Sequence, residues 1–553
     1  MRLATLKQMN SKQLVTPAVI LVLLAATLIF FWTSPKEGDF AWSDAPRHAL
    51  NAAFIKDCLT HRPWAEIGKY AQDYYIQYPA LSILFYPPLF SFVLAGFYSL
   101  FGVSHFVAQA CVAFFHFGLG VAGYLLAKRW FPPWQALGAA ILLIGLPEVA
   151  FWGRQVMLDI PAFAWLGFSV LFFLKYLDVR RPRCLYLSAG LLVCALYTKQ
   201  TLVYMPLVFV LALFLRLRTE VWRRREIWIT GIAILVSLVP LGVLTFYFGK
   251  INIRQTTGFN PAYAPHHRLE TWIFYAKQLP AQLGWPAFLA ALGTAIAFPF
   301  RNRWRLHHPD ASFLLGWFII GYIFFSSIWL QESRHDITIL FPVVVAAVLF
   351  ANRLMMPVEN ATARDSVVLM LALVTFCYPL VYRPIPYIRG YREAACWVLD
   401  HAPKNSVILF IGQRDGTFIF DVRADERRRD VSILRADKVL LRLAVKREYG
   451  VVDRGLSTED MLNIIQKHAV HYVVAQPKFW LDIPSMKTLD ELLHDTKHFE
   501  LAKTIKATGN SEHLEKEILI YRTLDPVAER PASISLELPG IGRSIKGDFG
   551  IAR

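Results

Sequence analysis

The strongest constraint in this sequence is a series of long apolar runs that fill the chain up to about residue 382 and are missing after it. Each run is roughly 15 to 23 residues long, close to the ~20 residues that an α-helix needs to cross a bilayer. The core of a soluble protein could not bury so many apolar residues, since 55% of the 553 residues are hydrophobic and only 18% are charged. The runs therefore predict an α-helical polytopic membrane protein with a water-soluble region at its C-terminal end.

Basic residues between the runs predict how the chain is oriented. If residues 85–101 lie along the membrane surface, about eleven helices remain and every basic connection falls on one side, which the positive-inside rule makes cytoplasmic. Counting 85–101 as a span reverses the later connections unless a further helix brings the total to about thirteen. We expect an integral plasma (inner) membrane protein with a cytoplasmic N-terminus and a periplasmic or other extracytoplasmic C-terminal domain. The predicted helices cover residues 14–33, 105–127, 134–151, 160–177, 184–197, 201–215, 227–248, 285–300, 312–330, 337–352 and 366–382.

The net charge of +17 does not indicate nucleic-acid binding in this chain. The densest basic cluster lies between two apolar runs, where it would set membrane orientation and contact anionic lipid headgroups. The cluster matches no known nucleic-acid-binding module. Membrane lipid is therefore the expected partner of its residues, which are Arg216, Arg218, Arg223, Arg224 and Arg225.

After residue 382 the sequence alternates between strand-like and helix-like stretches, which is typical of a small α/β domain. We predict a transmembrane domain over 1–382, whose first extracytoplasmic loop covers about 33–104, a soluble α/β extracytoplasmic domain over 383–524, and a mobile tail over 525–553 that is rich in Pro, Ser and Gly. The predicted strands cover 407–412, 431–434, 471–476 and 518–523, and the predicted helices cover 458–468 and 486–494.

Charged residues gather in three of the segments that the predicted orientation places outside. Charges that are partly buried at the edge of a membrane bundle are costly, so such residues are functional candidates. The segments are WSDAPRH (42–48), GRQVMLDIP (153–161) and QESRHD (331–336).

Asp44 and Arg47 stand three residues apart at the start of a predicted helix. This spacing puts a carboxylate and a guanidinium on one face of the first turn, where a base and an anion-binding group could act together. The alternative is that Asp44 only caps the helix, with Pro46 as an early helical residue. Spacing alone leaves both roles open.

The order of several segments is more informative than any one of them. A first loop with Asp44 and Arg47 is followed by a Pro-Pro pair, then by RQVMLDIPAF (154–163), LYTKQ (196–200) and ESRHDITILFP (332–342). This order resembles the bacterial branch of the protein O-mannosyltransferase superfamily, which includes the transferase that adds aminoarabinose to lipid A. The resemblance covers residues 14–350 and the general plan of a C-terminal extracytoplasmic domain.

The resemblance implies a GT-C fold, a polyprenyl-phosphate sugar as donor, and transfer on the outer face of the membrane. It also implies that Asp44 is catalytic, that Arg47 meets the donor phosphate, and that Asp159 corresponds to the family's second-loop aspartate. Two positions depart from the family pattern. Ala45 replaces a frequent Glu, which weakens the case for a protein acceptor, and Tyr86 replaces a frequent Lys before the Pro-Pro pair.

Another cation must therefore help to hold the phosphate, and Arg334, Arg154 and Lys199 lie on the correct side. A fixed arginine stabilises a departing phosphate by paired, charged hydrogen bonds. Asp44 would take the proton of the acceptor hydroxyl in a single inverting displacement. Asp159 could instead orient the acceptor or brace an arginine, or it could simply cap the helix before Pro161.

We expect no required cofactor. A divalent metal held by His335 and Asp336 together with His48, or with His266 and His267, stays an alternative, although no ligand spacing is regular. The acceptor could be a lipid, a glycan or a protein hydroxyl. A second class of function, a transporter or flippase of lipid-linked glycans, would place charges at mid-membrane in broken helices rather than on one face.

Overall fold

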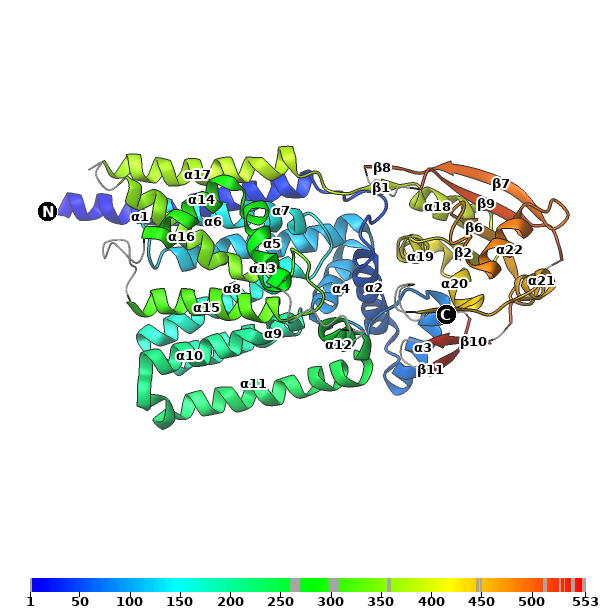
Figure 1. Ribbon diagram of the computed structural model, residues 1–553, viewed down its shortest axis with the longest axis horizontal. Coiled ribbons are helices and arrows are strands. Elements are labelled where there is room, and N and C mark those ends of the chain that lie inside the picture. Colours follow the sequence, from blue (N-terminus) through cyan, green and yellow to red (C-terminus); the bar gives the residue numbers. More distant parts are fainter. Residues whose placement is uncertain are drawn as a thin grey trace. The chain divides into compact units, whose positions relative to one another are not determined.

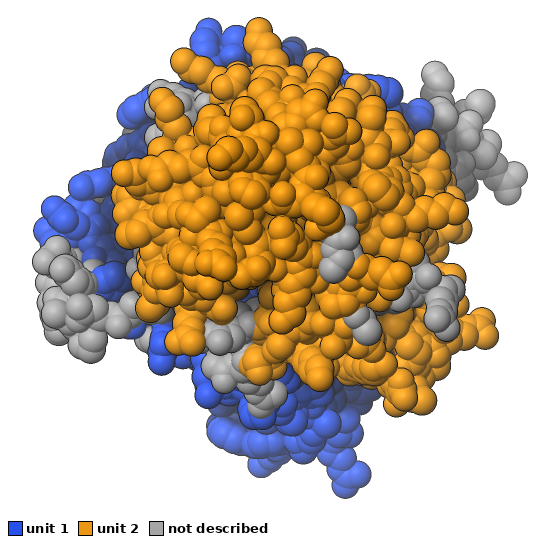
Figure 2. Space-filling model, turned by 90° about the vertical axis from the view of Figure 1, so that its right-hand side faces the viewer, with its two compact units in different colours: residues 1–34, 84–90, 109–385 blue, residues 35–83, 91–108, 386–553 orange. Residues whose placement is uncertain are grey.

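The computed structural model divides the chain into two compact units (Figures 1 and 2). Unit 1 comprises residues 1–34, 84–90 and 109–385, and unit 2 comprises residues 35–83, 91–108 and 386–553. Unit 2 thus combines the C-terminal domain with most of the first loop, which the sequence analysis assigned to the transmembrane domain. The structure describes residues 2–258, 269–297, 308–355, 360–443, 447, 450–510, 515–526, 529–531, 533–538 and 543–549.

Unit 1 is built from helices, and each predicted span overlaps at least one of them. In the described part of the chain, seven helices are long and apolar enough to cross a membrane, and α6 with α7 forms one further, bent candidate. Three predicted spans coincide with shorter apolar helices, at 17–32, 182–196 and 285–297. The elements are α1 (Arg2–Trp32), α5 (His105–Ala127), α6 (Pro133–Gly145), α7 (Pro147–Gly153), α8 (Asp159–Val179), α9 (Pro182–Leu196), η2 (Gln200–Tyr204), α10 (Met205–Leu217), η3 (Arg218–Arg223), α11 (Arg225–Val243), η4 (Leu244–Phe248), α12 (Lys250–Thr257), α13 (Leu269–Leu283), α14 (Trp285–Ala297), α15 (His308–Ser326), η8 (Ile337–Ile339), α16 (Leu340–Leu354) and α17 (Ala361–Tyr382).

The predicted span 134–151 is not one straight helix. Helices α6 and α7 meet at an angle of 63° where Leu146 joins them. Pro147 explains the break, because proline lacks the backbone N–H that a continuous helix needs and disfavours helical geometry in the residue before it. The bend matters for function because Glu148 lies just beyond it.

Helix α4 (Leu89–Phe101) follows the Pro-Pro pair and has only 13 residues. At 1.5 Å per residue it is about 20 Å long, shorter than the ~30 Å hydrocarbon core of a bilayer. Phe92, Leu100 and Phe101 are exposed. These features agree with a helix that lies along the membrane surface, and that placement stays a prediction.

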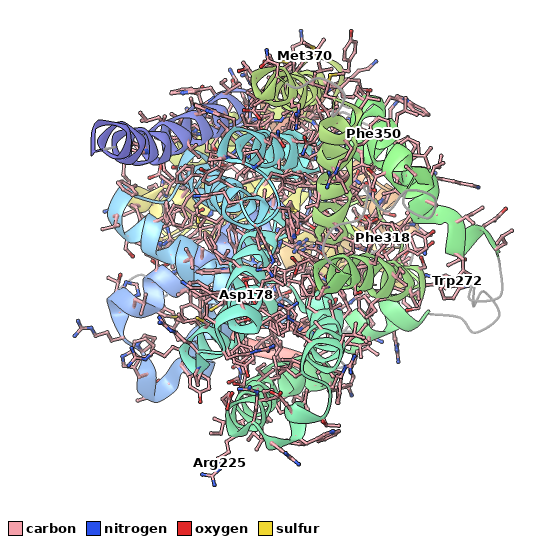
Figure 3. All side chains as sticks on the ribbon, turned by 90° about the vertical axis from the view of Figure 1, so that its left-hand side faces the viewer. Asp178, Arg225, Trp272, Phe318, Phe350 and Met370 are labelled. Carbon is pink, nitrogen blue, oxygen red and sulfur yellow. The ribbon has the colours of Figure 1, made fainter. Side chains whose placement is uncertain are left out.

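One end of unit 1 gathers residues from the predicted cytoplasmic connections. Arg129 binds Asp310, with its NH2 group 2.9 Å from Oδ1, and it also pairs with Asp178. Arg216 lies 3.7 Å from the same Asp178. Figure 3 looks onto this end, with Asp178 among the helices and Arg225 directed away from them. The predicted basic stretch 301–305 lies outside the described residues.

Unit 2 contains a mixed five-stranded sheet in the order β3-β2-β6-β9-β7. Strand β2 runs parallel to β3 and β6, whereas β9 runs antiparallel to β6 and β7. The sheet strands are β2 (Val407–Ile411), β3 (Ser432–Arg435), β6 (Val470–Ala475), β7 (Phe499–Lys506) and β9 (Glu517–Thr523). The remaining strands pair in twos and are β1 (Ile388–Arg389) with β8 (Thr508–Gly509), β4 (Leu441–Leu443) with β5 (Val451–Asp453), and β10 (Ser533–Leu538) with β11 (Arg543–Asp548).

The helices of unit 2 come from both parts of the chain. The first loop supplies α2 (Ala45–His61), η1 (Trp64–Glu66), α3 (Ile67–Gln77) and most of α4. The C-terminal part supplies α18 (Tyr391–His401), α19 (Asp415–Ala424), η9 (Glu426–Arg428), α20 (Ala436–Val439), α21 (Thr458–Lys467) and α22 (Pro484–Leu493). The strands and helices predicted after residue 382 are all present. Elements α18, α19 and β7 were not predicted from the sequence.

Part of the segment 525–553, for which the sequence predicts mobility, forms the hairpin β10–β11. Ile534 and Leu536 alternate along β10 and are buried in the core of unit 2, in the period-2 pattern of a strand with one face covered. The backbone N–H of Asp548 donates to Asp73 of α3 at 2.8 Å. The Pro, Ser and Gly content of this segment concealed that short alternation.

Candidate functional site

The start of α2 carries three of the predicted site residues, all in unit 2. Asp44 occupies the N-cap position, but its carboxylate does not cap the helix. Its backbone carbonyl accepts from the N–H groups of Arg47 and His48, each at 3.1 Å. His48 is only 1% exposed, so its imidazole is better placed to support the turn than to contact a substrate. Asp44 and Arg47 thus share one helical turn, as their spacing predicts.

Arg47 is held by a partner that the sequence analysis did not foresee. Its NH2 group donates to both carboxylate oxygens of Asp415, at 3.1 and 3.3 Å. Its NH1 group lies 3.5 Å from the carbonyl oxygen of Ala80. The Arg47 side chain is 25% exposed, so these partners do not cover it completely.

Asp159 and Lys199 form an ion pair in unit 1. Asp159 is the first residue of α8 and is 2% exposed, and its carboxylate accepts a hydrogen bond from the ammonium group of Lys199. Lys199 lies in the short turn between α9 and η2, where its backbone N–H bonds to Ala195 at 2.9 Å. Pairing favours a charged Asp159 that braces a cation over simple helix capping.

The loop 331–336 adds two more predicted residues to this pair. Arg334 donates from Nε to Glu332 at 2.7 Å and lies over the ring of Trp152, 5.2 Å from its centroid. Burial and the positive charges of Lys199 and Arg334 lower the pKa of His335 to about 3. Arg334 also acts electrostatically on Asp159. Asp159, Lys199, Arg334 and His335 therefore influence one another electrostatically, and we call these four residues the cationic cluster.

Glu148 supports the same loop and was missed by the sequence analysis. Its carboxylate accepts from Trp152 Nε1 at 2.7 Å, from Ser333 Oγ at 2.8 Å and from Arg383 NH2 at 2.6 Å. Glu148 is 1% exposed, so a buried charge here joins α7, the loop and the chain after α17. The signal was an acidic residue within an apolar run, which is costly unless it is paired.

Two other predicted residues lie elsewhere in unit 1. Arg154 is buried, and its NH2 group donates to the carbonyl oxygens of Pro379 and Arg383 at 3.0 and 3.2 Å. These bonds favour a structural role for Arg154 at the end of α17 over phosphate binding. Tyr86 is half-buried in a segment tied to the Lys199 turn, because the N–H of Leu89 donates to Tyr197 at 3.0 Å.

A metal site finds no support in the described residues. Nowhere among them do three or more His, Cys, Asp or Glu side chains come together in a manner that could hold an ion. His335 hydrogen-bonds through Nδ1 with the carbonyl oxygen of Leu330, 3.0 Å away. The alternative ligands His266 and His267 lie outside the described residues.

Comparison with known proteins shows what the fold resembles. Residues 86–243 match the sequence model of the family described as dolichyl-phosphate-mannose-protein mannosyltransferase. None of the curated protein sequences matches the chain significantly. ArnT from Cupriavidus metallidurans, bound to undecaprenyl phosphate, aligns with 92% of this chain and 99% of its own, at a TM-score of 0.62 and 14% identity.

Two glycosyltransferases from other organisms align less closely. The Archaeoglobus fulgidus oligosaccharyltransferase, in complex with Zn and sulfate, aligns over 83% of this chain and 68% of its own at a TM-score of 0.52 and 12% identity. The mycobacterial arabinofuranosyltransferase AftD aligns over 93% of this chain and 42% of its own at a TM-score of 0.52 and 14% identity. The chain is similar in fold to all three, which confirms the expected GT-C fold.

Proposed function

We propose that this membrane protein is a glycosyltransferase that moves a sugar from a polyprenyl-phosphate donor to an acceptor on the outer face of the membrane. The acceptor is a hydroxyl or phosphate of a lipid or glycan. The observation that carries the proposal is the cationic cluster, in which Lys199 pairs with a buried carboxylate and Arg334 acts on it electrostatically, in a GT-C fold. The solved ArnT structure with the same fold is bound to undecaprenyl phosphate, which supports a lipid phosphate as ligand.

Lys199 and Arg334 suit the leaving phosphate. Asp159 and Glu332 hold these two cations, so little side-chain freedom is lost when an anion binds. The stacking of Arg334 on Trp152 adds to this rigidity. As the bond to the sugar breaks, negative charge grows on the phosphate, and preorganised cations stabilise that charge most in the transition state. Asp159 is therefore assigned as a brace for Lys199.

Asp44 is the proposed general base. A carboxylate that takes the acceptor proton as the hydroxyl attacks allows a single displacement, which inverts the anomeric centre. Arg47, in the same turn, is assigned to the donor phosphate, as the family resemblance implies. The reaction requires no cofactor, because the acceptor oxygen and the leaving phosphate need only a base and fixed cations.

The test is a transfer assay with the purified full-length chain in lipid nanodiscs. A radiolabelled polyprenyl-phosphate sugar serves as donor and an envelope lipid extract as acceptor. We expect Asp44→Asn to lower kcat about a hundredfold or more, since a general base contributes roughly 10²- to 10⁴-fold. We expect Lys199→Met to lower kcat as well, because its ammonium group is assigned to the charge that grows on the leaving phosphate in the transition state. Glu66→Gln, an exposed carboxylate in the same first loop as Asp44, is the matched control and should leave transfer unchanged.

Undiminished kcat in the Asp44 variant would rule out this residue as the base. The alternative function, a flippase of lipid-linked glycans, is tested with the wild-type chain reconstituted in liposomes. Movement of the donor across the liposome membrane, together with no labelled product in the transfer assay, would favour that alternative. Product analysis of the anomeric configuration separately tests the inverting displacement.

A further inference from the structure

The carboxyl ends of the parallel strands in unit 2 are occupied by the first loop. Ligands of open α/β sheets commonly bind in the crevice at this edge. Arg414 follows β2 and donates from NH1 to the carbonyl oxygen of Ala41 at 2.5 Å. Arg435 ends β3 and donates from NH1 to the carbonyl oxygen of Pro79 at 3.3 Å. This edge therefore binds the protein's own first loop.

An alternating series of charges starts at the same edge and ends at Arg47. Arg435 donates to Asp437 from Nε at 2.9 Å and from NH2 at 2.6 Å, and it also pairs with Asp415. Asp415 in turn accepts both hydrogen bonds from Arg47. Although burial disfavours its charge, Asp415 and Asp437 raise the pKa of Arg435, so the guanidinium stays charged. Asp415 is thus fixed by one arginine and fixes the other.

Helix α19, which begins at Asp415, contacts the first loop at further points. Thr417 Oγ1 donates to the carbonyl oxygen of Phe40 at 3.0 Å. Gly416 lies so close to α2 that a Cβ atom there would stand 3.0 Å from Cγ of Pro46. A side chain at this position would therefore press against Pro46, and glycine lets α19 approach the first turn of α2 without that contact.

We propose that Asp415 is a positioning residue that orients the Arg47 guanidinium, so that the C-terminal domain holds the start of α2 ready for the donor. The inference rests on the proposed function, in which Arg47 binds the donor phosphate. A free arginine side chain loses rotamer entropy when it is fixed in one orientation. The ion pair with Asp415 already fixes the Arg47 side chain in the folded protein. Donor binding is therefore not opposed by this loss of entropy.

A double-mutant cycle on donor KM tests the proposal. Asp415→Asn keeps the shape of the side chain and removes its charge, and we expect donor KM to rise by about 10- to 100-fold, the loss typical of a charged hydrogen bond. In an Arg47→Ala background the same change should have little further effect, because Asp415 then has nothing to orient. Asp415→Glu should restore part of the affinity, since it keeps the charge.

The matched control is the exposed pair of Arg447 and Asp482 in the same unit, 2.9 Å apart from NH1 to Oδ1. Asp482→Asn should leave donor KM unchanged. If the effects of Asp415→Asn and Arg47→Ala on KM are additive, Asp415 has only a structural role and the proposal is overturned.

Hydrogen exchange separates this inference from the proposed function. In the full-length protein, Asp415→Asn should speed amide exchange in the first turn of α2, and Asp482→Asn should not. If the wild type transfers no sugar, the proposed function fails, whereas unchanged exchange in the Asp415 variant would overturn the positioning role whatever the activity. The exchange pattern of the remaining helices reports whether the variant is folded.

Discussion

Replacing Arg423 by methionine should loosen the contact between α2 and α19 more than any surface change nearby. Asp57 of α2 is 3% exposed and accepts from Arg423 Nε at 3.0 Å and from Arg423 NH2 at 2.6 Å. Arg423 itself is fully buried. Removing one partner of a buried pair leaves an uncompensated charge and costs about 3 to 5 kcal/mol.

The expected cost lies at the lower end of that range. Asp57 keeps two other donors, Arg429 NH2 at 2.9 Å and the hydroxyl of Tyr74 at 3.0 Å. We therefore expect a loss of about 3 kcal/mol, or roughly a hundredfold in the equilibrium for local opening. Amide hydrogen exchange of the full-length protein in nanodiscs measures this as exchange about a hundredfold faster in α2 and α19.

Two variants decide whether the buried pair is the cause. Arg427→Met removes an arginine four positions further on, which is 72% exposed and pairs with Asp425, and it should cost less than about 1 kcal/mol. Adding Asp57→Asn to Arg423→Met removes the under-paired carboxylate charge, while Arg429 keeps its pair with Glu426, so part of the loss should be recovered. Unchanged exchange in Arg423→Met, or a double variant that opens more easily than the single one, would refute the reasoning.

Two further predictions concern buried carboxyl groups. Glu148→Gln removes the charge opposite Arg383 and should lower transfer activity and speed exchange in the loop 331–336, whereas Glu220→Gln, at an exposed pair, should change neither. Burial and the nearby Asp39 raise the pKa of Asp421 well above its ordinary value, so the folded form is favoured at low pH and loses stability as pH rises through that pKa. Because Asp421→Asn cannot ionise, this variant should remove the increase in α18 amide exchange that rising pH causes beyond the change in intrinsic rates.

Features that depend on local sequence were predictable. The apolar runs mark helices because a bilayer demands about 20 apolar residues in a row wherever the chain crosses. Strands β2, β6 and β9 could be predicted because each is a short run rich in β-branched and aromatic residues, the types that pack well on the face of a sheet. Asp44 and Arg47 share a turn because a spacing of three residues is a local property of helices.

The bend at Pro147 shows where the same reasoning failed. The run 134–151 is apolar enough to be one span, so the hydropathy pattern hid both Pro147 and Glu148 within it. A proline followed by a glutamate in an apolar run is itself a signal of a broken helix with a buried charge. The partners of Arg154 were hidden for a different reason, because its expected side of the membrane says nothing about a carbonyl oxygen 225 residues further along the chain.

The partner of Arg47 could not have been predicted from one sequence. Asp415 is 368 residues away, and it begins a helix whose sequence, DGTFIFDVRA, shows no catalytic pattern. Long-range pairs depend on the packing of whole elements, and no local period encodes that packing. The C-terminal domain therefore offered no catalytic constellation in the sequence, although it supplies the charges that hold the first loop.

The contacts between the first loop and α19 respond to pH in opposite directions. Burial alone would raise the pKa of Asp57, but Arg423 and Arg429 lower it, so this contact is stable above about pH 4 and weakens as pH falls through the lowered value. The contact between Asp39 and Asp421 weakens as pH rises instead, because burial raises the pKa of both carboxyl groups above the ordinary value. The first loop should therefore be held most firmly at intermediate pH.

The pH dependence of these contacts affects how a pH profile of transfer activity is interpreted. A bell-shaped profile is usually assigned to an essential acid and an essential base. Here the same shape would arise from the loss of the contacts that hold the first loop and the start of α2, without titration of Asp44. If Asp421→Asn broadens only the high-pH limb, that limb reports the fit of α19 against the first loop, and the low-pH limb is then divided between the base and the Asp57 contact.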